Sequence, residues 1–137
     1  PREKVRTMSI SAMPRRAQYD EAYSAGAIAA NLIVSGDRTA ITIAAGITAV
    51  PYGVTAEAFA AGETKNVQTE GWAVVLAGAA GMTAGSWVMP EAGGTGCGVD
   101  ATAASGANCT VIGRCELAAA SGKLGLVKLG FFEKQFA

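Results

Sequence analysis

From residue 32 onward the chain is a series of short apolar runs, each ended by glycine, proline or another turn-forming residue. The runs are rich in Val, Ile, Thr and Trp, which favour strands, and glycine supplies the tight reversals between them. Their starts recur roughly every 8–15 residues, a spacing typical of antiparallel sandwiches and barrels. We therefore predict strands at 32–36, 40–43, 47–54, 64–70, 72–77, 86–89, 109–117 and 124–132.

Two segments depart from this pattern. Residues 17–32, AQYDEAYSAGAIAANL, are predicted to form a short helix or helical turn, with Asp20 and Glu21 near its start and Gly26 at its end. Residues 93–109 carry mostly small side chains, which predicts a surface loop or an irregular hairpin. The predicted fold is all-β, mainly an antiparallel sandwich or barrel-like, with at most one short helix. An extended N-terminal arm, residues 1–26, precedes a β-rich domain, residues 27–137.

The net charge of zero hides an uneven distribution along the chain. Residues 1–19 hold five basic side chains against Glu3 alone, whereas residues 20–137 hold six basic and ten acidic ones. A basic segment without apolar periodicity does not fold by itself, so it either orders on an acidic neighbour or stays a solvated terminus. Without interleaved aromatic residues it does not predict nucleic-acid binding. The candidate partner-contacting residues of the arm are Arg2, Lys4, Arg6, Arg15 and Arg16.

No combination of residues indicates catalysis. The 137 residues include no histidine, which excludes Ser–His and Cys–His nucleophile systems. No phosphate-binding glycine motif is present. The carboxylates considered for catalysis are expected at solvated strand edges and turns; they are Glu57, Glu63, Glu70, Glu91, Asp100 and Glu116. We predict that the protein is not an enzyme and uses no cofactor.

The three cysteines, Cys97, Cys109 and Cys115, do not have the spacing of a zinc site. They are expected to be reduced and partly buried, with a Cys97–Cys109 or Cys109–Cys115 bridge left open as an alternative. No uninterrupted apolar run is long enough for a membrane span, so no membrane partner is predicted.

Composition favours an assembly component. Only 16% of the residues are charged, which is low for a small soluble monomer, and such a chain often hides part of its surface in partners. Trp72 and Trp87 each lie in an apolar run, where core packing is the simpler interpretation and a subunit seam the other. The candidate seam residues are Trp72, Trp87, Phe131 and Phe132. A recurring AAGxT motif, at 44–48, 60–64 and 79–83, is interpreted as repeated turn chemistry.

Two stretches, AGETKNVQTEGWAVVLAGAAGMTAGSWVMPEAGG and TVIGRCELAAASGKLGLVKL, resemble the capsid decoration, or cement, proteins of tailed bacteriophages. The shared elements are a charged turn at Glu63–Val67, strands at Gly71–Ala77, Val111–Arg114 and Leu124–Leu129, and an Ala/Gly hairpin at Gly78–Met89. The resemblance covers roughly residues 32–132 and departs in the basic arm and in residues 93–109.

The resemblance implies a structural protein on the outer surface of an icosahedral phage head. Such a protein is made in the host cytoplasm, assembles as a homotrimer, and stabilises the expanded head by bridging neighbouring subunits of the major capsid protein. The expected partners are therefore the major capsid protein and further copies of the same chain, with residues 1–26 crossing onto the capsid or a neighbouring trimer.

Two alternatives from other classes remain at this stage. One is a carbohydrate- or host-binding module on a virion or cell surface, which requires Tyr19, Tyr23, Tyr52 and Trp87 to line one exposed face. The other is a small β-barrel enzyme, which requires two carboxyl groups facing each other inside a pocket.

Overall fold

The computed structural model describes residues 17–46, 50–101 and 108–135, and these residues form ten strands and no helix. The strands make two five-stranded sheets. The first contains β1 (Gln18–Ser24), β2 (Ile33–Asp37), β3 (Ala40–Ile43), β4 (Pro51–Thr55) and β5 (Glu63–Glu70). The second contains β6 (Trp72–Leu76), β7 (Trp87–Pro90), β8 (Gly98–Asp100), β9 (Asn108–Leu117) and β10 (Leu124–Gln135). The all-β prediction is confirmed.

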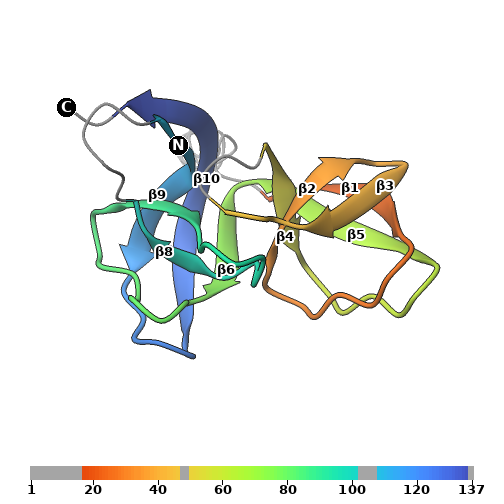
Figure 1. Cartoon of the computed structure of the whole chain (residues 1–137), viewed down its shortest axis with the longest axis horizontal. Coiled ribbons are helices and arrows are strands. Elements are labelled where there is room, and N and C mark those ends of the chain that lie inside the picture. Colours follow the sequence, from red (N-terminus) through yellow and green to blue (C-terminus); the bar gives the residue numbers. More distant parts are fainter. Residues whose placement is uncertain (1–16, 47–49, 102–107, 136–137) are drawn as a thin grey trace, which may run out of the picture.

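The two sheets have the same topology. Their strand orders are β1-β5-β4-β2-β3 and β6-β10-β9-β7-β8, so each strand of the second sheet is the counterpart of the strand five places earlier. Neighbouring strands pair antiparallel in both. The chain is therefore two consecutive units of one pattern, here called the first unit (residues 17–70) and the second unit (residues 71–135). Figure 1 shows them side by side, with the first unit in red to yellow-green and the second in green to blue.

The residue register repeats along with the topology. Val54 pairs with Gln68 in the first unit, and Arg114, 60 positions after Val54, pairs with Lys128, 60 positions after Gln68. Irregular features repeat too. A two-residue bridge joins Ile28 to Phe59 in the first unit and Met82 to Ala119 in the second, and the left-handed conformation of Asn31 recurs at Gly85. The correspondence thus holds residue by residue across most of both units.

Each sheet curls until its edge strands meet. The Tyr23 amide of β1 donates to the Arg38 carbonyl at the β2–β3 turn, 2.9 Å away. In the second unit Ala77, just after β6, bridges Gly98 of β8, and the Gly78 amide donates to the Gly98 carbonyl at 2.8 Å. The barrel-like prediction therefore applies to each unit separately, as a small curled sheet.

Each unit encloses its own apolar core, and the second core extends into the first unit. The first core is formed by Ala22, Ile28, Leu32, Val34, Ile41, Phe59 and Val67. The second contains the counterparts of five of these, namely Val75, Met82, Val88, Ala119 and Val127, with further residues of the second unit. It also takes in Ile33, Ala44 and Val54 from the first unit. Because this cluster joins both units, they pack as one body.

Backbone hydrogen bonds also cross between the units. The Ile33 amide donates to the Gly96 carbonyl at 2.7 Å, and the Leu76 amide donates to the Asn31 carbonyl at 2.9 Å. At the level of elements, β4 and β5 of the first unit contact β6, β9 and β10 of the second. One side of the first sheet is thus covered by the second unit.

The helix predicted within residues 17–32 is wrong, because residues 18–24 form β1. Ala22 and Ser24 are buried, while Tyr19, Glu21 and Tyr23, at the alternate positions, are exposed, which is the alternation of a strand. Pairing of β1 with the whole length of β5 outweighs the local helix signals. Residues 93–109, predicted as a loop or irregular hairpin, contain the short strand β8, which pairs with β7.

The glycines of the AAGxT motifs serve turns as predicted, since Gly62 and Gly81 have φ values of 81° and 75°. The motif spacing does not reveal the actual repeat, however. Gly62 corresponds to Gly122, which has a φ of 78° and lies in an AASGK sequence rather than AAGxT. The duplication is preserved in hydrogen bonding and backbone conformation more than in residue identity.

Candidate assembly face

A row of four large side chains crosses four adjacent strands of the second sheet. Trp72 on β6 pairs with Lys128 on β10, Lys128 pairs with Arg114 on β9, and Arg114 pairs with Trp87 on β7. Directly paired residues of antiparallel strands project from the same face of the sheet. The four side chains therefore form one line, with two cations between two indoles, which we call the Trp–cation row.

Burial shows that this row lies on the outside of the second unit. The residues next to it along the strands are almost completely buried and line the core; they are Ala73, Val88, Cys115 and Val127. Arg114 and Lys128 are exposed, and the Trp87 side chain keeps 41% of its surface accessible. Side chains alternate between the two faces of a strand, so the row must point away from the core.

The same outer face continues as an apolar surface beside the row. Val74 pairs with Leu126, Leu126 pairs with Leu117, and Leu124 pairs with Leu76. Among these, Leu117, Leu124 and Val74 remain 62%, 54% and 41% exposed. An antiparallel sheet with one face on the core normally carries polar residues on the other. Contiguous exposed apolar residues instead mark an interaction surface.

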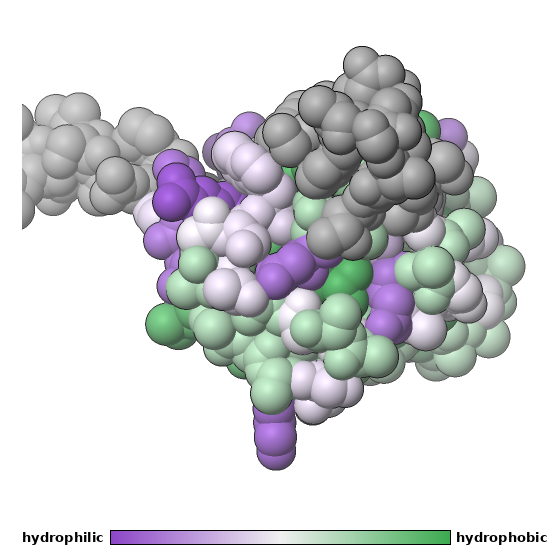
Figure 2. All heavy atoms as spheres, turned by 60° about the vertical axis from the view of Figure 1, so that its left-hand side comes forward, coloured by the Kyte–Doolittle hydropathy of each residue, from purple (hydrophilic) through white to green (hydrophobic). Residues whose placement is uncertain are grey.

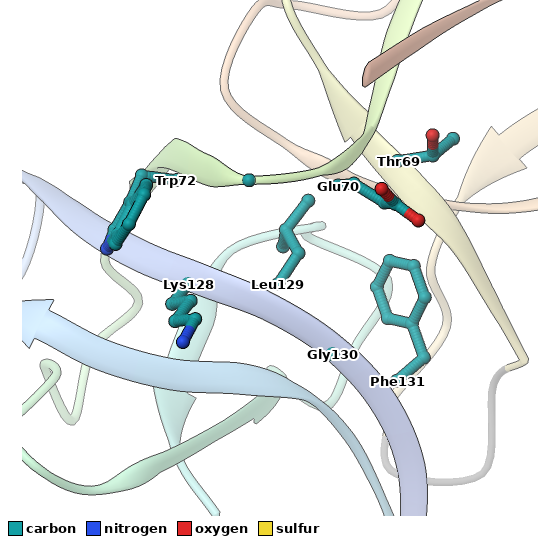
Figure 3. Close-up of a pocket in the computed structure, with 8 residues that line it drawn as sticks. Thr69, Glu70, Trp72, Lys128, Leu129, Gly130 and Phe131 are labelled. Carbon is teal, nitrogen blue, oxygen red and sulfur yellow. The ribbon is translucent and has the colours of Figure 1, made fainter. Parts of the chain in front are cut away.

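Two hollows flank the row where β10 bends. One, of about 330 Å³, lies between the β5–β6 connection and β10, and the other, of about 490 Å³, lies between β10 and the Trp87–Arg114 side. Leu129 and Phe131 border both. Figure 3 shows Trp72 and Phe131 at opposite ends of the first hollow with Leu129 between them. In Figure 2, which brings the second unit forward, pale and green residues form most of the coloured surface and purple is confined to separate places.

The electrostatics of the row favour an acidic partner. Arg114 and Lys128 are directly paired across β9 and β10, and like charges in such positions repel. The Lys128 Nζ atom lies 5.8 Å from the centroid of the Trp72 ring, a distance compatible with a cation–π contact. Within the part of the chain that the structure describes, Lys65 forms an ion pair with Glu63, whereas neither row cation is paired with a carboxylate.

Carboxylates of the body mostly hold turns and loops. Asp37 accepts hydrogen bonds from the Thr39 hydroxyl and amide and from the Ala40 amide, and these bonds, led by the hydroxyl, lower its pKa. Glu63 accepts from the Ala60 amide, which lowers its pKa. Three others bind loop groups: Glu57 accepts from the Asn66 amide, Glu91 from the Ala79 amide and the Thr95 hydroxyl, and Asp100 from the Thr83 amide and hydroxyl.

All three cysteines are free, which removes the two disulfides left open by the sequence. Cys109 and Cys115 are buried, and burial raises the pKa of both thiols. The Cys109 Sγ lies 3.2 Å from the Met89 sulfur. Among the described residues no cluster of three Cys, Asp or Glu side chains is arranged to hold a metal ion. No helix in this part of the chain is long and apolar enough to cross a membrane.

Three of the four candidate seam residues gather around β10. Trp72 and Trp87 end the row and Phe131 borders both hollows, whereas the side chain of Phe132 lies outside the described part. The five arm residues, Arg2, Lys4, Arg6, Arg15 and Arg16, also lie outside the described residues. Sequence reasoning did not name Arg114 or Lys128 among the candidate functional residues. Alternation along β9 and β10 could predict that Arg114 and Lys128 each project from one face of its strand. Only the pairing register between the two strands places the two cations side by side.

The aromatic residues required by the carbohydrate-binding alternative lie on different surfaces. Tyr19 and Tyr23 project from β1, whereas Trp87 belongs to the second sheet. Tyr52 is half-buried against the first core, and its hydroxyl donates to Asp20 at 3.2 Å. Burial, followed by the Asp20 carboxylate, raises the pKa of Tyr52.

Comparison with known proteins gives a fold likeness. No protein-family model matches the sequence, and no curated protein sequence matches it. The fold is similar to a crystal structure described as the N base of the head fiber gp8.5 of bacteriophage phi29, with a TM-score of 0.62 and 20% sequence identity. The match covers 84% of this chain and 95% of the other. At this identity the likeness establishes a shared fold.

Proposed function

We propose that this protein is a structural component of a tailed-phage head, bound to the outer surface of the capsid. The observation that carries the proposal is the fold likeness to a head-fiber base, because it extends over nearly the whole of both chains. The resemblance of residues 32–132 to capsid decoration proteins supports the same place in the virion.

The proposed protein assembles as a homotrimer and bridges neighbouring subunits of the major capsid protein. An exposed apolar sheet face supports self-assembly, since burying such a face removes apolar area from water. Symmetric copies bound together would hold the capsid through several contacts at once, which raises the effective concentration of each. In this way modest individual contacts can stabilise the expanded head.

The basic segment that precedes β1 is proposed to contact the capsid. Its five cations, Arg2, Lys4, Arg6, Arg15 and Arg16, match an acidic neighbour in charge. It continues into β1, which is held along β5, so the arm would leave the body at a defined point.

The proposal is tested with phage heads that lack the protein. Purified full chain is added, and occupancy is measured by co-sedimentation and by electron microscopy of the heads. We expect saturable binding to the outer surface and a rise in the temperature at which heads release DNA. Failure of the full chain to bind heads would overturn the proposal. Deleting residues 2–16 should lower occupancy; unchanged occupancy and unchanged DNA release would remove the arm from the mechanism.

A carbohydrate-binding role on the virion surface is the second candidate, favoured by the two accessible rings that share β1, Tyr19 and Tyr23. Screening the folded chain on a glycan array separates the two roles. Glycan binding by a chain that does not bind phage heads would favour this second candidate.

A further inference from the structure

The internal repeat shows what the Trp–cation row corresponds to in the first unit. The equivalent positions of Lys128, Arg114 and Trp87 are Gln68, Val54 and Ile33. All three are buried, and Ile33 and Val54 belong to the core shared with the second unit. On the first unit the chain thus covers three of the four row positions, and the fourth, Tyr19 as the counterpart of Trp72, remains exposed. On the second unit the same positions are at the surface.

The elements that cover the first unit can be traced through the repeat as well. β6, β9 and β10 contact β4 and β5. The first-unit counterparts of β6, β9 and β10 are β1, β4 and β5. If a second copy continued the packing that already exists within the chain, it would bring the β1 side of its first unit against the row.

The chemistry of β1 suits the row. β1 exposes Tyr19, Glu21 and Tyr23 on one face, a carboxylate between two aromatic rings, and Asp20 on the other face, where it accepts a hydrogen bond from the Tyr52 hydroxyl. Residues 17–70 hold six acidic and two basic side chains. Carboxylates placed beside the directly paired Arg114 and Lys128 would neutralise their repulsion, and aromatic rings would pack with the indoles that end the row.

We propose that the outer face of the second unit binds the β1 side of the first unit of a second copy, head to tail. The two surfaces differ, so the contact is heterologous and closes into a ring or continues as a filament. The contact buries the apolar residues beside the row, among them Val74, Leu117 and Leu124. It relies on the proposed function only for the number of copies: three copies joined in this way would be the homotrimer.

Charge reversal on each surface tests the proposal. One variant carries Arg114→Glu with Lys128→Glu, a second carries Asp20→Lys with Glu21→Lys, and a third combines all four changes. The mass of each full-length chain is measured by sedimentation velocity across a concentration series. We expect the wild type to associate, each double variant to associate at least tenfold more weakly, and the combined variant to recover association because both charges are exchanged.

The controls each carry one charge reversal of the same kind elsewhere on the surface. Lys123→Glu, at the turn before β10, and Glu57→Lys, between β4 and β5, should leave the association unchanged. Circular dichroism and melting temperature show that each variant is folded. Unchanged association of either double variant, or no recovery in the folded combined variant, would overturn the proposal. Stronger association in a mixture of the wild type with the Arg114→Glu/Lys128→Glu variant would also overturn it, by indicating a row-to-row contact.

Head binding by the same proteins separates this inference from the proposed function. A wild-type chain that stays monomeric in solution and on heads, yet occupies them, would overturn the head-to-tail contact and leave the function standing. A chain that associates as expected but does not bind heads would overturn the proposed function and leave the head-to-tail contact standing.

Discussion

Gly53 and Gly113 occupy equivalent places in the two units, and each lies against the carbonyl oxygen of an equivalent residue. A Cβ atom on Gly53 would overlap the Gln68 carbonyl, and a Cβ atom on Gly113 would overlap the Lys128 carbonyl. The repeat therefore preserves a close backbone approach between β4 and β5, and between β9 and β10. Only a residue without a side chain allows this approach.

We predict that Gly53→Ala and Gly113→Ala each lower the free energy of unfolding by about 2–3 kcal/mol, because backbone must shift to admit the methyl group. Urea denaturation followed by circular dichroism measures this loss. Gly26→Ala is the matched control, since a Cβ atom there meets nothing within 4 Å. It should change stability by less than about 0.5 kcal/mol. Equal effects at the three positions would contradict the prediction.

Val54→Ala is expected to destabilise both units together. Val54 is buried and belongs to the core cluster of the second unit, so the lost methyl groups and the cavity should cost about 2 kcal/mol. Tryptophan fluorescence reports on Trp72 and Trp87, which both lie in the second unit, and far-ultraviolet circular dichroism reports on all strands. We expect one transition, coincident in both signals and shifted by the variant. Val50→Ala, at a position 77% exposed, should leave the midpoint of the transition unchanged.

The β2–β3 turn should carry a pH-dependent contribution to stability. The hydrogen bonds from Thr39 and Ala40 lower the pKa of Asp37 in the folded state. The contribution is therefore present above the unfolded pKa of about 3.9 and is lost as the pH falls through the lower, folded value. We expect the melting-temperature difference between wild type and Asp37→Asn to shrink between pH 6 and pH 3. A difference independent of pH would show that the charge of Asp37 does not matter.

The cysteines should differ in reactivity toward a thiol reagent. Cys97 is half-buried, whereas Cys109 and Cys115 are buried and have raised thiol pKa values. At pH 8 we expect one thiol to react quickly in the folded protein and the other two only as it unfolds. Mass spectrometry after digestion identifies the site, and Cys97→Ser should remove the fast phase. Rapid labelling of Cys109 would contradict the described burial.

Most strand locations were predictable, because each follows from a local run of β-favouring residues between turns. The run at 40–43 coincides with β3, and that at 72–77 is within one residue of β6. β1 was missed because its pattern of exposed tyrosines and buried Ala22 and Ser24 makes sense only when β5 lies beside it. β8 was missed because three residues pairing with β7 carry no local signal of their own.

The sequence by itself determined that the chain is β-rich, rich in turns and sparing in charge, since these properties depend on residue type and short spacing. Only the tertiary structure decided which sheet face is covered. Gln68 and Lys128 occupy equivalent positions, yet Gln68 is buried and donates to the Glu70 and Trp72 carbonyls, whereas Lys128 is exposed beside Trp72. The second unit covers the first, and such covering comes from residues far away in the sequence, beyond the reach of any local pattern.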